Sequence, residues 1–175
     1  MAFIIAQIFG VLGMAMNILS YQAKKQQNII LIQFFGSVFF TVNMFMLNAY
    51  TGALLNSIGV IRAFTYANKN KIKNLKPINI LFIMAYIISY ILTFTLFNKT
   101  ASVFNLIIEI LPVIAMVATT ISFAKEGAKD IRKFVFISSP SWLIYNCFNL
   151  ALGGIICEIF TLISTVIGII RFDKK

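Results

Sequence analysis

The sequence lacks several residue types on which most enzyme and metal sites depend. Among its 175 residues there is no histidine, and the two cysteines, Cys147 and Cys157, are isolated from each other. No glycine-rich phosphate loop and no nucleophile motif is present in the sequence. We therefore expect no metal ion, no cofactor and no catalytic centre, and the protein is not expected to be an enzyme.

Charge is also scarce. Only 11% of the residues are charged and five are acidic, whereas 60% are hydrophobic. A helix that spans a membrane needs about 20 apolar residues. Seven such segments fill the chain, at roughly 3–22, 28–47, 49–67, 77–97, 101–124, 130–150 and 152–171. The sequence thus predicts an all-α membrane protein with seven transmembrane helices and the lipid bilayer as its first partner.

The basic residues are distributed unevenly between the connecting loops. Loops that follow odd-numbered spans carry most of them, and the loops that follow even-numbered spans carry only Lys99. The tail adds Arg171, Lys174 and Lys175. Because positive loops stay in the cytoplasm, this pattern predicts an outside N-terminus and an inside C-terminus. We interpret the net charge of +10 as loop charge beside anionic lipid, and we expect no nucleic-acid partner.

The second half of the sequence repeats the first at an offset of 102. Identical or related residues recur at that spacing: Ser37 and Ser139, Gly52 and Gly154, Gln7 and Glu109, Asn56 and Glu158. Repeats of this kind in a membrane protein place the substrate site between them. We predict two parallel three-helix-bundle repeats, at 1–67 and 99–175, joined by a basic loop and a linker helix at 68–98. The sequence also allows a homo-oligomer.

Two acidic residues, Glu109 and Glu158, fall inside the predicted fifth and seventh spans. A charge there costs a few kcal/mol and normally faces the bundle interior. Each acid therefore belongs either to a ligand pathway or to a structural hydrogen bond between helices. Gly52 lies one turn before Asn56, and Gly154 one turn before Glu158, as expected where small residues let helices approach closely.

Other polar residues share helix faces with these positions. On the first span, Gln7, Gly10 and Asn17 form one stripe. On the sixth, Trp142 and Asn146 place an aromatic plane beside an amide, which fits either a ligand site or plain packing. Arg62 lies near the cytoplasmic end of the third span. We expect its side chain to extend outward to the membrane surface rather than to pair with Glu158.

Two prolines interrupt the second half, and neither has a counterpart in the first. Pro112 falls in the fifth span and Pro140 in the sixth, where the first half has Gly10 and Val38. A proline frees a backbone carbonyl and kinks a helix. Pro112, Pro140 and Gly10 are therefore candidate hinges, and a static kink is the alternative.

Four segments of the second half resemble the bacterial YgjV family of inner-membrane proteins. They are EILPVI at 109–114, WLIYN at 142–146, GG at 153–154 followed by Glu158, and IIRF at 169–172. The resemblance covers almost the whole chain and groups it with SWEET sugar transporters, PQ-loop proteins and the KDEL receptor. It implies a 3+1+3 arrangement of helices, a polar pair on the third and seventh helices (here Asn56 and Glu158), and hinge prolines.

The leading functional hypothesis is a permease-like protein for a small polar molecule. Its central site would open alternately to either side of the membrane and would be lined by Gln7, Asn17, Asn56, Glu109, Trp142, Asn146 and Glu158. In this hypothesis Glu158 binds the ligand and Glu109 couples a proton. A membrane receptor or scaffold that binds a ligand without transporting it is the main alternative.

Overall fold

The computed structural model describes residues 2–47, 49–149 and 151–173. These residues form seven α-helices and one 3-10 helix, and no strand occurs among them. The elements are α1 (Ala2–Ser20), α2 (Gln26–Met46), α3 (Tyr50–Ala67), η1 (Lys69–Lys71), α4 (Lys76–Thr95), α5 (Val103–Ala124), α6 (Ala128–Phe148) and α7 (Leu152–Phe172). Each predicted span corresponds to one helix, with ends that differ by at most two residues. Lys174 and Lys175 of the predicted basic tail lie outside the described residues.

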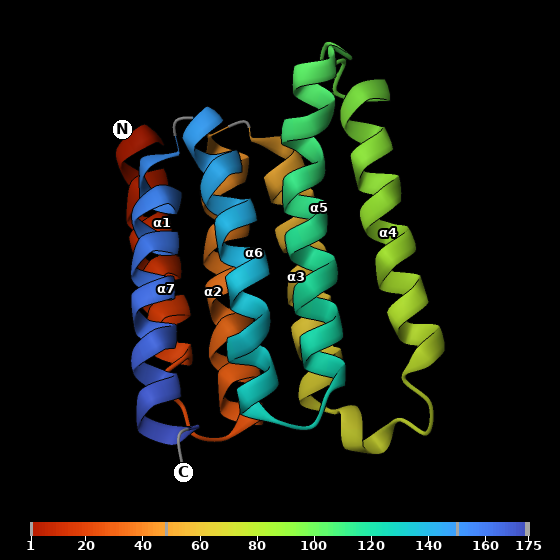
Figure 1. Cartoon of the computed structure of the whole chain (residues 1–175). Coiled ribbons are helices and arrows are strands. Elements are labelled where there is room, and N and C mark those ends of the chain that lie inside the picture. Colours follow the sequence, from red (N-terminus) through yellow and green to blue (C-terminus); the bar gives the residue numbers. More distant parts are fainter. Residues whose placement is uncertain (1, 48, 150, 174–175) are drawn as a thin grey trace.

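The helices pack in two layers (Figure 1). α1, α2 and α3 form one layer, α7, α6 and α5 form the other, and α4 lies at the edge. α1 contacts α2 and α7, α3 contacts α2 and α5, and α6 contacts α5 and α7, so six helices close a ring around a common interior. α4 packs against α3 and α5 on the outside of this ring.

The helices alternate in direction, which gives the bundle two distinct ends. α1, α3, α5 and α7 begin at the end that we call the far end, and they finish at the opposite end (Figure 1). The loops at this opposite end carry Lys24, Lys25, Lys71, Lys73 and Lys125, and we call it the basic end. The far end carries Lys99 in the loop between α4 and α5.

Apolar side chains cover the outside of the bundle, and several charged ones are buried inside it. Val103 is 74% exposed and Leu81 66%, whereas Arg132 and Glu109 are fully buried. This distribution is the reverse of that in a soluble protein and fits a surface in contact with lipid. Five helices, α1, α2, α4, α5 and α7, are long and apolar enough to cross a membrane. α3 and α6 carry more polar residues, many of which face the interior of the ring.

Local sequence explains where several helices begin and where the core lies. Pro77 occupies the first turn of α4, where its missing N–H would have no partner in any case. Ser102 caps α5, and its side chain accepts a hydrogen bond from the Asn105 N–H at 3.2 Å. Toward the basic end, Tyr66 packs edge-on against Phe123, and their ring centroids are 6.0 Å apart. Aromatic packing therefore holds α3 against α5 on the side that α4 covers.

Candidate functional site

A polar cavity of about 80 Å³ lies inside the six-helix ring. Its walls come from both layers of helices. The lining residues are Asn17, Tyr21, Gln33, Ser37, Phe40, Met44, Asn56, Arg62, Met116, Thr119, Ser138, Ser139, Trp142, Asn146, Gly154 and Glu158. We call this space the central cavity.

The structure brings five of the predicted site residues together in the central cavity. They are Asn17, Asn56, Trp142, Asn146 and Glu158. Gln7 instead lines a separate pocket of about 280 Å³ at the far end, and Glu109 lines neither space. These five residues thus face the interior of the ring, whereas Gln7 and Glu109 lie outside the central cavity.

Many residues around the central cavity are 102 positions apart in the sequence. The pairs are Asn17 and Thr119, Ser37 and Ser139, Phe40 and Trp142, Met44 and Asn146, and Asn56 and Glu158. In four of these pairs, one or both members are site residues predicted from the sequence. The offset applied to every predicted position would have found Phe40 and Met44 as well.

Glu158 places a carboxyl group at the wall of this cavity. Its side chain is 9% exposed, and its Oε2 accepts a hydrogen bond from the Ser139 hydroxyl of α6. The equivalent amide, Asn56, instead donates to the backbone oxygen of Gly52 at 2.9 Å within its own helix. Asn56 Nδ2 also lies 3.5 Å from the Met44 sulfur of α2. The acid therefore joins α7 to α6, and its uncharged counterpart contacts α2 from α3.

Trp142 and Asn146 contribute an aromatic ring and an amide to the same wall. The Trp142 ring meets Tyr145 edge-on with 5.7 Å between centroids. Asn146 is buried, and its Oδ1 has no hydrogen-bond partner among the described residues. A Cβ at Gly154 would lie 2.5 Å from Asn146 Nδ2, so this amide packs directly on the glycine of α7. On α1, Asn17 Nδ2 lies 3.9 Å from the Cys157 sulfur.

Arg62 points inward, and the prediction that it extends to the membrane surface is wrong. The residue is 5% exposed, and its Nη1 donates to the Met116 carbonyl of α5 at 3.2 Å. Its Cζ lies 5.0 Å from the Phe123 ring centroid, a cation–π contact. Because α2, α4 and α5 pack around α3, the outward path leads through protein rather than to lipid head groups. Arg62 is thus a cationic group of the central cavity.

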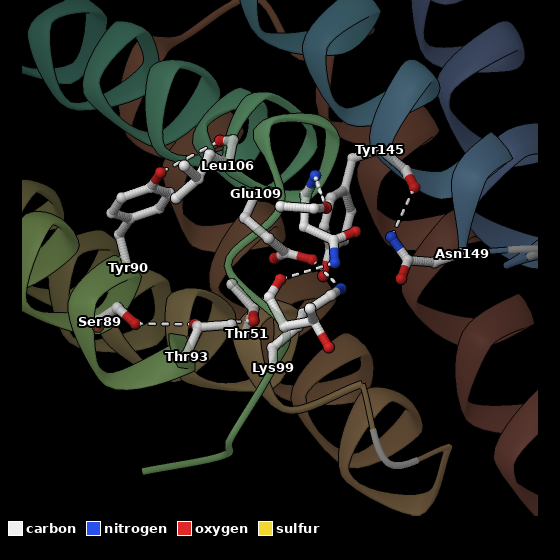
Figure 2. Close-up of polar contacts among 12 residues, drawn as sticks. Thr51, Ser89, Tyr90, Thr93, Lys99, Leu106, Glu109, Tyr145 and Asn149 are labelled. Atoms are coloured by element: carbon white, nitrogen blue, oxygen red, sulfur yellow. Dashed lines mark hydrogen bonds and ion pairs between the residues drawn. The ribbon is translucent and has the colours of Figure 1, made fainter. Parts of the chain in front are cut away.

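Glu109 belongs to a separate cluster near the far end, which Figure 2 shows. Its Oε1 forms an ion pair with Lys99 from the loop between α4 and α5. Tyr145 of α6 lies beside Glu109, and Thr51 of α3 shares a hydrogen bond of 2.9 Å with Thr93 of α4. Glu109 Oε2 has no hydrogen-bond partner among the described residues. Polar contacts thus connect α3 with α4, and the loop after α4 with α5.

The candidate hinges lie inside helices or at a close contact. Pro112 is buried within α5, and Pro140 lies within α6 one residue after Ser139. Gly10 is buried, and a Cβ there would lie 3.1 Å from Asn43 Nδ2 of α2. The Asn43 amide in turn donates to the Ala6 carbonyl at 2.7 Å. Gly10 therefore permits a close approach between α1 and α2.

A second ion pair joins several segments at the basic end. Arg132 Nη1 lies 2.8 Å from Asp173 Oδ1, and Arg132 Nη2 donates to the Ala23 carbonyl at 2.7 Å. Gly168 leaves room for this arrangement, because a Cβ there would lie 2.6 Å from the Tyr21 backbone oxygen. The contacts join the start of α6, the end of α7 and the loop after α1.

Lys69 makes a further connection at this end. Its Nζ donates to the Gln26 side-chain oxygen at 2.9 Å and to the Phe123 carbonyl at 3.2 Å. Partial burial lowers the pKa of Lys69 below its ordinary value, and the nearby Glu126 opposes this shift. The end of α5 is thereby held against η1 and the start of α2.

Comparison with known proteins agrees with the apolar, multi-helix architecture. No curated protein and no solved structure matches this chain. A family model described as a bacterial inner membrane protein, Imp-YgjV, matches residues 4–175. The match spans nearly the whole chain and includes all seven helices. The chain therefore belongs to the YgjV family of bacterial inner membrane proteins.

Proposed function

We propose that the protein is a permease-like carrier of a small polar molecule, which binds in the central cavity. The observation that carries the proposal is the position of Met44 and Asn146. Both residues line the central cavity, and both also line the far-end pocket. A movement of these two side chains would join the pockets into one path from the far end to the cavity.

Two glycines leave the room that these side chains occupy. A Cβ at Gly52 would lie 2.3 Å from the Met44 sulfur, and a Cβ at Gly154 would lie 2.5 Å from Asn146 Nδ2. Met44 and Asn146 are 102 positions apart, as are the two glycines. Each repeat would thus contribute one side chain, Met44 or Asn146, to a partition between the two pockets. Each would also contribute one glycine that leaves room for that side chain.

The path toward the basic end is narrower in this conformation. Tyr21, Thr119 and Ser138 line both the central cavity and a space of about 10 Å³ on that side. A space of this size holds at most about one water molecule. Arg132 and Asp173 lie further toward the basic end and would have to separate for the cavity to open there.

The proposed mechanism uses the 3+1+3 arrangement. The directions of the helices support it, because α1–α3 and α5–α7 both begin at the far end and α4 lies outside the ring. The lining pairs at the offset of 102 support it as well. Parallel repeats of this kind are related by an axis along the membrane normal, and rocking of one repeat against the other exposes the site to alternate sides.

We assign the basic end to the cytoplasm, because cytoplasmic loops of membrane proteins carry an excess of lysine and arginine. The N-terminus then lies outside and the C-terminus inside. A C-terminal fusion to green fluorescent protein should be fluorescent, and a C-terminal fusion to alkaline phosphatase should be inactive. The reverse result would overturn this orientation.

Glu109 is proposed to couple a proton to transport. Its carboxylate is buried and paired with Lys99. Protonation would remove the negative charge and release Lys99, which would loosen the loop between α4 and α5 at the far end. Uptake driven by a pH gradient in proteoliposomes should depend on the gradient in the wild type and lose this dependence in Glu109→Gln.

Accessibility of the cavity to a water-soluble reagent tests the permease without knowledge of the substrate. In a background that carries Cys147→Ser and Cys157→Ala, Ser37→Cys and Ser139→Cys place a thiol on each side of the central cavity. A membrane-impermeant methanethiosulfonate should label both variants from either side of oriented vesicles. Ile137→Cys on the lipid-facing side of α6 is the matched control and should remain unlabelled.

Labelling from one side alone would contradict alternating access and favour the receptor or scaffold. The same outcome combined with ligand binding but no flux would establish that alternative. In transport assays with a panel of radiolabelled polar metabolites, Glu158→Gln should reduce uptake at least tenfold. Uptake that is unchanged in both Glu158→Gln and Glu109→Gln would remove these residues from the proposed site.

A further inference from the structure

The central cavity contains two buried ionisable side chains of opposite kind, the base Arg62 and the acid Glu158. Arg62 is 5% exposed and Glu158 is 9% exposed. Among residues 2–47, 49–149 and 151–173, the ion pairs are Lys99 with Glu109 and Arg132 with Asp173, so neither cavity residue takes part in one. A buried charge without a counterion is costly, which makes this arrangement informative.

The protein itself satisfies each of the two groups only in part. Arg62 Nη1 donates to the Met116 carbonyl, but Arg62 Nε has no hydrogen-bond partner among the described residues. A guanidinium stays protonated in proteins and has five N–H donors. Glu158 accepts a hydrogen bond from Ser139 on one oxygen, and a carboxylate has about four lone-pair sites. Both groups therefore retain capacity for a ligand.

Their separation along the bundle fits a small bridging molecule. α3 and α7 both begin at the far end, at Tyr50 and Leu152, so Arg62 lies 12 residues into α3 and Glu158 six residues into α7. At 1.5 Å per residue the two Cα atoms differ in depth by about 9 Å. Arg62 Nη2 lies 3.9 Å from the Cβ position of Gly59, so its side chain reaches back toward the depth of Glu158.

We propose that the ligand of the central cavity is a small zwitterion that carries a carboxylate and an amine. The carboxylate would be held by Arg62 and the amine by Glu158, and each charge of the ligand would neutralise one buried charge of the protein. Such charge-assisted hydrogen bonds are about twice as strong as neutral ones. Asn56 and Asn146, which line the same cavity, offer neutral donors and acceptors beside them.

The volume of the cavity narrows the class further. About 80 Å³ is several times the roughly 10–15 Å³ that one water molecule needs. Such a space favours a small ligand, of the size of the smallest amino acids. This inference rests on the proposed function, because it names the substrate class of the same site.

Calorimetric titration of the purified protein in detergent tests the inference. The probes are glycine, L-alanine, L-serine and β-alanine, each compared with the carboxylic acid that lacks its amine and with the amine that lacks its carboxylate. At least one zwitterion should bind at least tenfold more tightly than both of its singly charged analogues. Failure of all four zwitterions to bind, or equal binding of a zwitterion and its amine, would overturn the proposal.

Variants then test which protein residue binds which charged group of the ligand. Arg62→Gln should weaken zwitterion binding at least tenfold and leave binding of the amine analogue unchanged, whereas Glu158→Gln should weaken both. Arg171→Gln, which changes an exposed arginine of α7, is the control and should bind as the wild type does. Arg62→Lys keeps the positive charge and should bind more tightly than Arg62→Gln. If Arg62→Gln does not fold, Arg62→Lys takes its place and should weaken zwitterion binding while binding of the amine analogue stays unchanged. Equal zwitterion affinity in Arg62→Lys and the wild type would then contradict the contact between Arg62 and the carboxylate.

The results separate this inference from the permease proposal. Zwitterion binding without uptake into proteoliposomes would overturn the permease and leave the zwitterion site standing. Uptake of a molecule that lacks either charge, dependent on Glu158, would support the permease and overturn the zwitterion inference.

Discussion

The two halves of the chain contribute matching positions to the central cavity but opposite charges. Asn56 in the first half corresponds to Glu158 in the second, and both line the cavity. The cation, Arg62, comes from the first half, and the position 102 residues later is Ser164. Most lining positions therefore recur at the offset of 102. The ionisable residues do not, because Glu158 corresponds to an amide and Arg62 to a serine. In the proposed function, a site built in this way would distinguish the two ends of an asymmetric ligand.

Between the two halves, the largest difference in the effect of a substitution on the free energy of unfolding is expected at positions 7 and 109. Lys99→Met should lower the free energy of unfolding by about 4 kcal/mol, because it leaves Glu109 buried without a counterion. Gln7→Leu, at the equivalent position of the first half, should change it by less than about 1 kcal/mol. SDS titration in mixed micelles measures both. Lys99→Met combined with Glu109→Gln should recover most of the loss, and a double variant as unstable as Lys99→Met would refute the ion-pair explanation.

A charge exchange tests whether positions 56 and 158 are interchangeable. Glu158→Asn should weaken binding of the best zwitterion by roughly 30-fold, the equivalent of about 2 kcal/mol for one charge-assisted hydrogen bond. Asn56→Asp added to this variant restores a carboxylate on the opposite wall and should recover about tenfold. Calorimetric titration gives both affinities. No recovery would show that the halves are not equivalent around the ligand.

Alanine substitutions at Gly52 and Gly154 compare how freely Met44 and Asn146 can move. At Gly154 an added Cβ meets three Asn146 atoms at 2.5, 2.6 and 2.9 Å, whereas at Gly52 it meets the flexible Met44 side chain. Gly154→Ala should therefore destabilise the protein by about 2 kcal/mol, and Gly52→Ala by less than about 1 kcal/mol. Thermal unfolding in detergent ranks the two. Equal losses would mean that Asn146 can move as freely as Met44.

The smallest effect is expected at the paired serines. Ser139→Ala removes the hydroxyl that donates to Glu158 and should lower the free energy of unfolding by about 1.5 kcal/mol. Ser37→Ala removes the hydroxyl at the equivalent position of the first half, which also lines the cavity, and should cost less than about 0.5 kcal/mol. The same unfolding assay applies. A larger loss for Ser37→Ala would reverse the proposed asymmetry.

Much of the fold and of the cavity could be predicted from residue pattern. Apolar length predicts the seven helices, and five of them are long and apolar enough to cross the hydrocarbon. The polar stripes identified Asn17, Asn56, Trp142, Asn146 and Glu158, since an uncompensated polar group facing lipid is costly. The polar pattern did not reveal that Gln7 lines the far-end pocket instead, or that Glu109 pairs with Lys99.

Arg62 shows where pattern reasoning fails. An arginine near the end of a spanning helix normally extends toward the head groups when that face of the helix meets lipid. Here α4 and α5 cover that face, and the guanidinium bonds to a carbonyl of α5 instead. The direction of this side chain depends on which helices are neighbours, which periodicity within one helix does not reveal.

The sequence by itself determined the helices, the basic end and the internal offset, because helix length, loop charge and repeat spacing are properties of local sequence and of the bilayer. The tertiary structure decided which polar residues share a cavity, that Met44 and Asn146 line both pockets, and that Glu109 pairs with Lys99. These features arise between helices distant in sequence, where close packing fixes which side chains meet.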